Sequence, residues 1–303
     1  MKKVVILGSS DSGTKNNPYV LSQHLRAKGH DVEICYWEHL VFDIKTDSVK
    51  ISSQLKDIAT DIQPDLVIAL GWYKQGKQAF YRDVAYATAL YLKHHEIPFW
   101  NSEMGQQRST TKLSCMVELA LHGISVPDTL FSIGGSLIQQ PEPPFIAKAI
   151  SASRGQDNFL VRSSEQGKEL LNNDMNKYLV QPFMPNDHDL RVICFGGEPS
   201  LILKRSRDEA SDSHLNNTSQ GGNAQWLELS SVDEKLLTVS REICIIMRRE
   251  MGGIDFIPDA SSPFGYSCLE VNAIPQLTSG HDTLKKLDIF VESVEKQEKR
   301  KVR

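Results

Sequence analysis

Two short runs of alternating apolar residues near the C-terminus constrain this chain more than any other feature. The runs span residues 252–257 and 268–275, and a polar turn with Pro and Gly separates them, which predicts a β-hairpin. Asp255 is the one acidic residue of the first run. Glu270 and Asn272 lie two apart on the second run, so their side chains leave the same face of the strand. Three oxygen donors on adjacent strands suit Mg²⁺, so the hairpin predicts a magnesium–nucleotide site.

Each of these side chains also has an ordinary explanation. A lone Asp on a strand is most often solvated or paired with a basic residue, so Asp255 alone does not indicate a metal. The combination of Asp255 with Glu270-x-Asn272 and a Pro three residues later favours the metal site.

The composition limits the class of protein. The 303 residues are 40% apolar and 24% charged, an ordinary globular composition with room for two or three domains. With 38 acidic against 34 basic residues and no dense basic stripe before the last few positions, a nucleic-acid partner is not expected. The five cysteines are scattered, which favours core residues in a reducing compartment. No segment of the chain predicts a signal peptide or a membrane span, so we expect a cytoplasmic protein without a membrane partner.

The first hundred residues alternate between strand-like and helix-like patterns. Apolar runs at 3–8, 31–37 and 64–71 are separated or followed by segments with helical spacing. Strands that alternate with helices predict a parallel sheet covered by helices, and hence an α/β domain of the Rossmann type.

Two lysines stand out by their positions. Lys148 interrupts the apolar strand predicted at 144–150, and a lysine is seldom buried unless it is paired, so Lys148 predicts contact with an anion. Lys112 opens a helical segment, where a cation gains nothing from the helix dipole. By position alone, a solvated surface lysine is the favoured interpretation of Lys112.

Two stretches resemble a known family. The hairpin reads Gly-Ile-Asp-Phe-Ile and then Leu-Glu-Val-Asn-Ala-x-Pro, and residues 112–129 read Lys-x₆-Leu-x₃-Gly-Ile-x₂-Pro-x-Thr. Both resemble the ATP-grasp superfamily, in the branch with the ribosomal-protein glutamate ligases (RimK-like) and glutathione synthetase. One departure is Gln276, where the family often has Gly.

The resemblance implies an α/β ATP-grasp fold with an α+β lid. The expected division is a Rossmann-like domain at 1–101, a central lid domain at 102–187, a C-terminal antiparallel-sheet domain at 188–290 and a charged tail at 291–303.

The resemblance also implies roles for individual residues. The expected nucleotide contacts are Lys112, Lys148, Gln181, Pro182, Phe183, Asp189 and Asn217. Asp255, Glu270 and Asn272 would hold Mg²⁺, with Mn²⁺ as an alternative, against the phosphates of ATP. Arg191 and Arg205 are the catalytic candidates, because a guanidinium can hold the transferred phosphoryl group and the tetrahedral intermediate. An ion pair between the strand neighbours Asp189 and Arg191 is the ordinary alternative.

The expected activity is ATP-dependent ligation of a carboxylate to an amine, with an amino acid or peptide as substrate. An acyl phosphate forms, the amine attacks it, and ADP and phosphate leave. Such chemistry depends on positioning and charge stabilisation, which agrees with a sequence without a Ser/His/Asp constellation. Two alternative functions are a small-molecule kinase on the same fold and a nucleotide-binding protein without catalysis. The sequence also allows a homo-oligomer.

Overall fold

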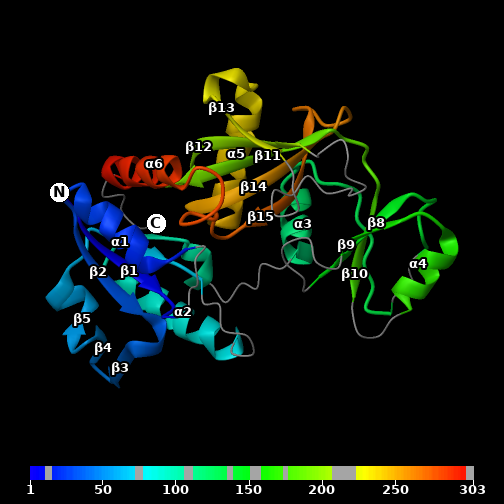
Figure 1. Ribbon diagram of the computed structural model, residues 1–303. Coiled ribbons are helices and arrows are strands. Elements are labelled where there is room, and N and C mark those ends of the chain that lie inside the picture. Colours follow the sequence, from blue (N-terminus) through cyan, green and yellow to red (C-terminus); the bar gives the residue numbers. More distant parts are fainter. Residues whose placement is uncertain are drawn as a thin grey trace.

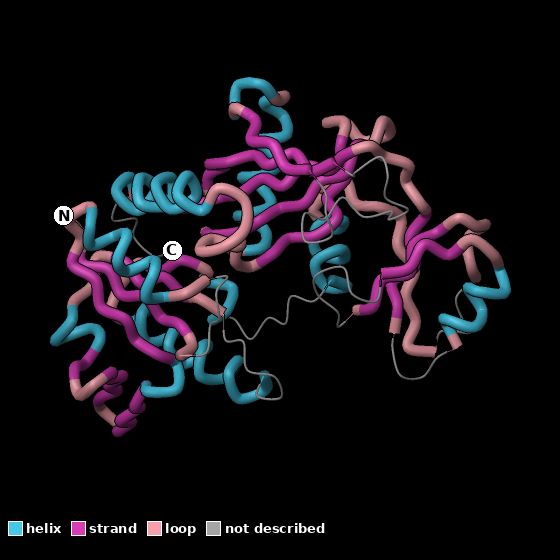
Figure 2. The backbone as a smooth tube through the Cα atoms, in the orientation of Figure 1, coloured by secondary structure: helices cyan, strands magenta, loops and turns pink. Residues whose placement is uncertain are grey.

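The computed structural model describes residues 1–10, 16–71, 78–105, 112–134, 139–150, 158–172, 177–206 and 223–297. Within these ranges the strands form four sheets, one of five strands, one of four and two of three, with the helices packed on them (Figures 1 and 2). The strands are β1 (Lys3–Gly8), β2 (Asp31–Tyr36), β3 (Leu40–Lys45), β4 (Ser48–Ser53), β5 (Lys56–Asp57), β6 (Leu66–Ala69), β7 (Phe99–Trp100), β8 (Phe145–Ala149), β9 (Asn158–Val161), β10 (Tyr178–Pro182), β11 (His188–Phe195), β12 (Glu198–Ser206), β13 (Asn223–Leu227), β14 (Met251–Pro258) and β15 (Tyr266–Asn272). The helices are α1 (Pro18–Ala27), α2 (Gln78–His94), α3 (Lys112–Leu121), α4 (Ser164–Leu171), α5 (Glu234–Met247) and α6 (Thr283–Lys296).

The N-terminal sheet has the order β2-β1-β6-β7, and its strands are parallel, as the alternating pattern predicted. Its central strands are apolar and buried on both faces apart from Lys3 at the start of β1, which is the usual state of parallel strands covered by helices. The small antiparallel sheet β3-β4-β5 follows β2 and was not predicted.

The C-terminal sheet has the order β13-β12-β11-β14-β15 and is antiparallel. The predicted hairpin is confirmed as β14 and β15, with Asp255 directly opposite Glu270 and Gly253 opposite Asn272. The register shifts between Asp255 and Phe256, so Leu269 is an extra residue on β15 and forms a bulge. This irregularity lies beside the predicted ligands.

Helix α6 lies between the N-terminal and C-terminal sheets (Figure 1). One core cluster joins Leu25 of α1, Phe290 of α6 and Phe195 of β11, so the two parts share an apolar interior. Val291 and Val294 of α6 are also buried there. The first residues of the predicted tail at 291–303 therefore belong to this helix, because its apolar stripe continues to Val294; residues 298–303 lie outside the described ranges.

The central sheet β10-β8-β9, with α4 packed on it, stands apart from the other two sheets (Figure 2). Helix α3, assigned by the sequence to this central part, packs instead on the C-terminal sheet. Cys115, Met116 and Leu119 of α3 share a core with Val192 of β11 and Ile243 of α5, because the apolar stripe of α3 faces them. The described packing therefore begins the lid after α3.

Candidate active site

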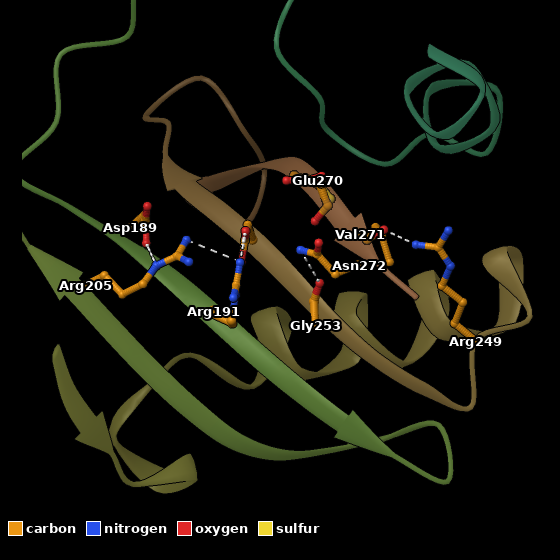
Figure 3. Close-up of polar contacts among 10 residues, drawn as sticks. Asp189, Arg191, Arg205, Arg249, Gly253, Glu270, Val271 and Asn272 are labelled. Carbon is orange, nitrogen blue, oxygen red and sulfur yellow. Dashed lines mark hydrogen bonds and ion pairs between the residues drawn. The ribbon is translucent and has the colours of Figure 1, made fainter. Parts of the chain in front are cut away.

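The predicted ligands and the predicted catalytic arginines meet on one face of the C-terminal sheet. Arg191 on β11 is the register partner of Asp255 on β14, which in turn faces Glu270 on β15. Asp189 on β11 faces Arg205 on β12. Antiparallel pairing thus brings residues from four strands to one surface, as the sticks in Figure 3 show for the labelled side chains.

Asp255 is fully engaged with the arginines. Arg191 Nε and Nη2 donate to its two carboxylate oxygens, at 2.6 Å each, and Arg205 Nη2 lies 3.4 Å from Oδ1. Burial raises the pKa of Asp255, but the positive charges of Arg191 and Arg205 outweigh that effect and hold the pKa below 3.8. The predicted metal ligand is therefore ionised and neutralised by the two predicted catalytic residues.

Asp189 completes a buried four-charge network. Arg205 Nε donates to Asp189 Oδ1 at 2.5 Å, and both side chains are almost withdrawn from solvent. Burial raises the pKa of Asp189 despite the attraction of Arg205. The partner of Asp189 is thus Arg205 across the strands, and the pairing with Arg191 considered as the ordinary alternative is not the one formed.

Glu270 and Asn272 offer the oxygens that a hard cation needs. Asn272 Nδ2 lies 3.4 Å from the Gly253 carbonyl, which leaves the amide Oδ1 as an acceptor (Figure 3). The side chain of Glu270 makes no hydrogen bond or ion pair within the described ranges. A carboxylate that forms no ion pair among the described residues, beside an amide oxygen, fits Mg²⁺. Asp255 would join them only after exchanging Arg191, and no group of three His, Cys, Asp or Glu among the described residues is arranged for a metal.

The two predicted lysines lie together at the lid side of this surface. Lys112 Nζ donates to the carbonyl of Ala149, the residue after Lys148, at 3.1 Å. Burial lowers the pKa of Lys148 to about 8; the negative charges of Glu270 and Asp255 oppose this shift, and Lys112 adds to it. Lys148 therefore experiences the carboxylates of the hairpin although it comes from another sheet.

The other predicted nucleotide contacts form hydrogen bonds within the lid or lie at the end of β10. Gln181 is buried on β10, and its Nε2 donates to Thr129 Oγ1 at 2.9 Å. Pro182 ends the strand, and the backbone N–H of Phe183 donates to the Pro144 carbonyl at 3.4 Å. Asn217 lies outside the described residues.

Two buried cations near this surface were not predicted. Arg249 and Lys286 are 2% and 4% exposed. Lys286 Nζ donates to the carbonyls of Gln276 and Ser279, at 2.7 Å each, so it closes the loop after β15. Arg249 lies in the short connection between α5 and β14, where a charged residue is ordinary, and its partner Glu103 is remote in sequence.

Comparison with known proteins identifies the family of this arrangement. Residues 109–295 match the RimK-like ATP-grasp domain. The chain belongs to the RimK-like ATP-grasp family. It is therefore an ATP-grasp ligase, of the class that forms carbon–nitrogen bonds and releases ADP. The resemblance inferred from the hairpin and the Lys112 segment is confirmed.

Curated relatives of this RimK-like chain carry a common description. This chain is 25% identical over 214 residues to a probable alpha-L-glutamate ligase of Aeromonas salmonicida; the match covers 63% of this chain and 67% of the relative. It is 22% identical over 267 residues to a probable alpha-L-glutamate ligase of Vibrio vulnificus, covering 85% and 83%. These similarities support the family and leave the substrate of this chain open.

Solved structures confirm the ATP-grasp fold. The ligase PsnB, complexed with a minimal precursor, Mg and ADP, superposes with a TM-score of 0.68 at 14% identity, covering 96% of this chain and 97% of PsnB. The D-alanine–D-alanine ligase of Bacillus anthracis, complexed with ATP, gives a TM-score of 0.58 at 15% identity, covering 97% of each chain. None of the helices in the described ranges combines the length and apolar character that a bilayer crossing needs.

Proposed function

We propose that this chain binds ATP with Mg²⁺ between the lid and the β14–β15 hairpin and ligates an amine to a carboxylate of an amino acid or peptide. Two observations carry the proposal: Lys112 Nζ donates to the carbonyl beside Lys148 on β8, and the negative charges of Glu270 on β15 and Asp255 on β14 act on the pKa of Lys148. Lys148 of the lid and the oxygen donors of the hairpin thus influence each other electrostatically, which supports binding of Mg²⁺ and triphosphate by the two parts together.

The residues divide into three roles in this proposal. Glu270 and Asn272 hold the metal, which when bound draws charge from the phosphates. Lys112 and Lys148 bind phosphate oxygens from the lid side. Arg191 and Arg205 stabilise the negative charge that develops on the transferred phosphoryl group and on the tetrahedral intermediate.

The charge pattern favours a carboxylate substrate over the hydroxyl substrate of a kinase. A carboxylate is already a nucleophile, whereas a hydroxyl needs a general base to take its proton. The carboxylates of Asp189 and Asp255 are both bound to arginines, and Glu270 serves the metal. The relatives described as probable alpha-L-glutamate ligases support glutamate as the amine, and the precursor bound to PsnB supports a peptide as the carboxylate donor.

A product analysis tests the proposal. The purified protein is incubated with ATP, Mg²⁺ and pairs of amino acids and peptides, and ADP release is followed with mass spectrometry of the products. We expect ADP release that needs both substrates and a product equal to their sum less one water. A phosphorylated product made without any amine would instead establish a kinase.

A second prediction concerns pH, because the lowered pKa of Lys148 lies near 8. Between pH 8 and 10.5, Lys148 is protonated in the unfolded chain but largely deprotonated in the folded one. Burial of Lys148 therefore lowers the free energy of unfolding at neutral pH, and this loss becomes smaller as pH rises through that range. ATP binds the charged form, so we expect its affinity to fall by about tenfold from pH 7 to 9, since one pKa unit is worth about 1.4 kcal/mol.

Calorimetry of ATP binding at both pH values checks this expectation. The Lys148→Met variant should bind weakly with little pH dependence, whereas Lys168→Met, which removes an exposed lysine of α4 in the same lid, should behave as the native chain. A native pH profile in the Lys148→Met variant would contradict the assignment of Lys148 to the phosphates.

A further inference from the structure

The outer edge of β15 is held by a side chain from outside the strand. Because β15 is an edge strand of the described sheet, backbone groups along its outer side have no partner within the sheet. Arg249 Nη1 donates to the carbonyl of Val271 (Figure 3). Val271 is the residue between Glu270 and Asn272. One hydrogen bond thus fixes the segment that separates the two proposed metal ligands.

Arg249 is balanced by an equally buried carboxylate from the N-terminal part of the chain. Its Nε donates to Glu103 Oε2 at 2.5 Å, and each residue is only 2% exposed. Glu103 lies in the short helical turn Ser102–Gly105 that follows β7. A buried guanidinium is strongly disfavoured without a counter-ion, so Glu103 is what allows Arg249 to reach the strand.

The segment around Glu103 holds the hairpin at further points. Asn101 is fully buried with φ of 66°, a left-handed conformation that Asn tolerates better than most residues. Its Oδ1 accepts from the Met251 N–H at 3.0 Å, and its Nδ2 donates to the Ala273 carbonyl at 3.0 Å. Arg249 and Asn101 therefore hold carbonyls on both sides of Asn272.

We propose that Arg249 is a positioning residue for the metal site, and that through Glu103 the N-terminal part of the chain determines how well Glu270 and Asn272 hold Mg²⁺ and nucleotide. A metal ligand tolerates only small displacements, so releasing the Val271 carbonyl misplaces both flanking side chains at once. The inference rests on the proposed function, since it requires these two residues to be ligands. A purely structural ion pair would affect folding alone.

A paired substitution separates the two roles. Arg249→Met with Glu103→Leu removes both buried charges, an exchange that often keeps or raises stability, but it also removes the donor to Val271. We expect a melting temperature close to the native value and Mg·ADP binding at least about tenfold weaker, with ADP binding in EDTA unchanged. The matched control is Arg241→Met with Glu198→Leu, on α5 and β12. It removes an exposed ion pair of 2.8 Å, together with the 3.0 Å pair between Arg241 and Glu234, and should leave all these quantities unchanged.

Calorimetric titration of ADP, with and without Mg²⁺, and thermal melting supply the measurements. Native Mg·ADP affinity in a folded double variant would overturn the inference. If that variant does not fold, Arg249→Lys decides, because an ammonium keeps the charge beside Glu103 but has all its donors on one nitrogen, whereas the guanidinium reaches Glu103 and Val271 from two separate nitrogens. Its Mg²⁺-dependent affinity should fall, and a native value would overturn the inference. Absence of any Mg²⁺ effect in the native chain would refute the proposed function instead.

Discussion

The Glu270→Gln variant is expected to lose at least about a hundredfold in turnover while remaining folded. Glu270 carries a carboxylate that forms no ion pair within the described ranges and would give a bound metal ion two charged oxygens, whereas Asn272 offers one neutral oxygen. Gln keeps the size and removes the charge. Charge stabilisation by a bound ion is worth several kcal/mol, and about 1.4 kcal/mol corresponds to a tenfold change in rate.

Steady-state ADP release and the melting temperature are measured together on this variant. Because Glu270 forms no ion pair within the described ranges, its replacement removes no such partner and the melting temperature should stay near the native one. Glu292→Gln, on the exposed side of α6 beside Lys296, is a control with native turnover. An unaltered rate in folded Glu270→Gln protein would refute the metal site.

Local sequence patterns were sufficient for the hairpin and the parallel N-terminal sheet. The apolar runs and the polar turn between them located the strands, although β14 is buried at each position from Met251 to Ile257 and not on alternate residues. The placement of Glu270 and Asn272 on one strand of the hairpin followed, since residues two apart on a strand share a face. Lys148 was found because a lysine within an apolar strand needs an anion.

Features that depend on distant residues were beyond the sequence pattern. The partner of Asp189 is set by the register of β11 and β12, and the partner of Arg249 by the docking of two parts of the chain. The small sheet β3-β4-β5 has exposed, mixed strands without a clear alternation.

The Asp255→Asn variant is expected to lose about 3 kcal/mol of unfolding free energy at pH 7, together with its activity. Asp255 is 6% exposed and neutralises Arg191 and, in part, Arg205. Breaking a buried pair on one side leaves an uncompensated charge, at a cost of about 3–5 kcal/mol; the low end applies because the Arg191 side chain keeps 24% exposure. Denaturant unfolding measures the change. Asp43→Asn, which breaks an exposed pair with Lys45, should cost less than about 1 kcal/mol.

The pH dependence of the stability difference between the native chain and Asp255→Asn tests whether it comes from the charge of Asp255. The folded pKa of Asp255 lies below 3.8, so its ionic contribution is fully present above that value and is lost as pH falls through the folded pKa. Protonated Asp255 then resembles Asn, and the native and Asp255→Asn stabilities should converge in acid. A difference that stays constant from pH 7 into this acid range would show that the carboxylate charge does not stabilise the arginines. The double variant Asp255→Asn with Arg191→Gln should regain part of the stability at pH 7, because the stranded guanidinium is gone, but no activity.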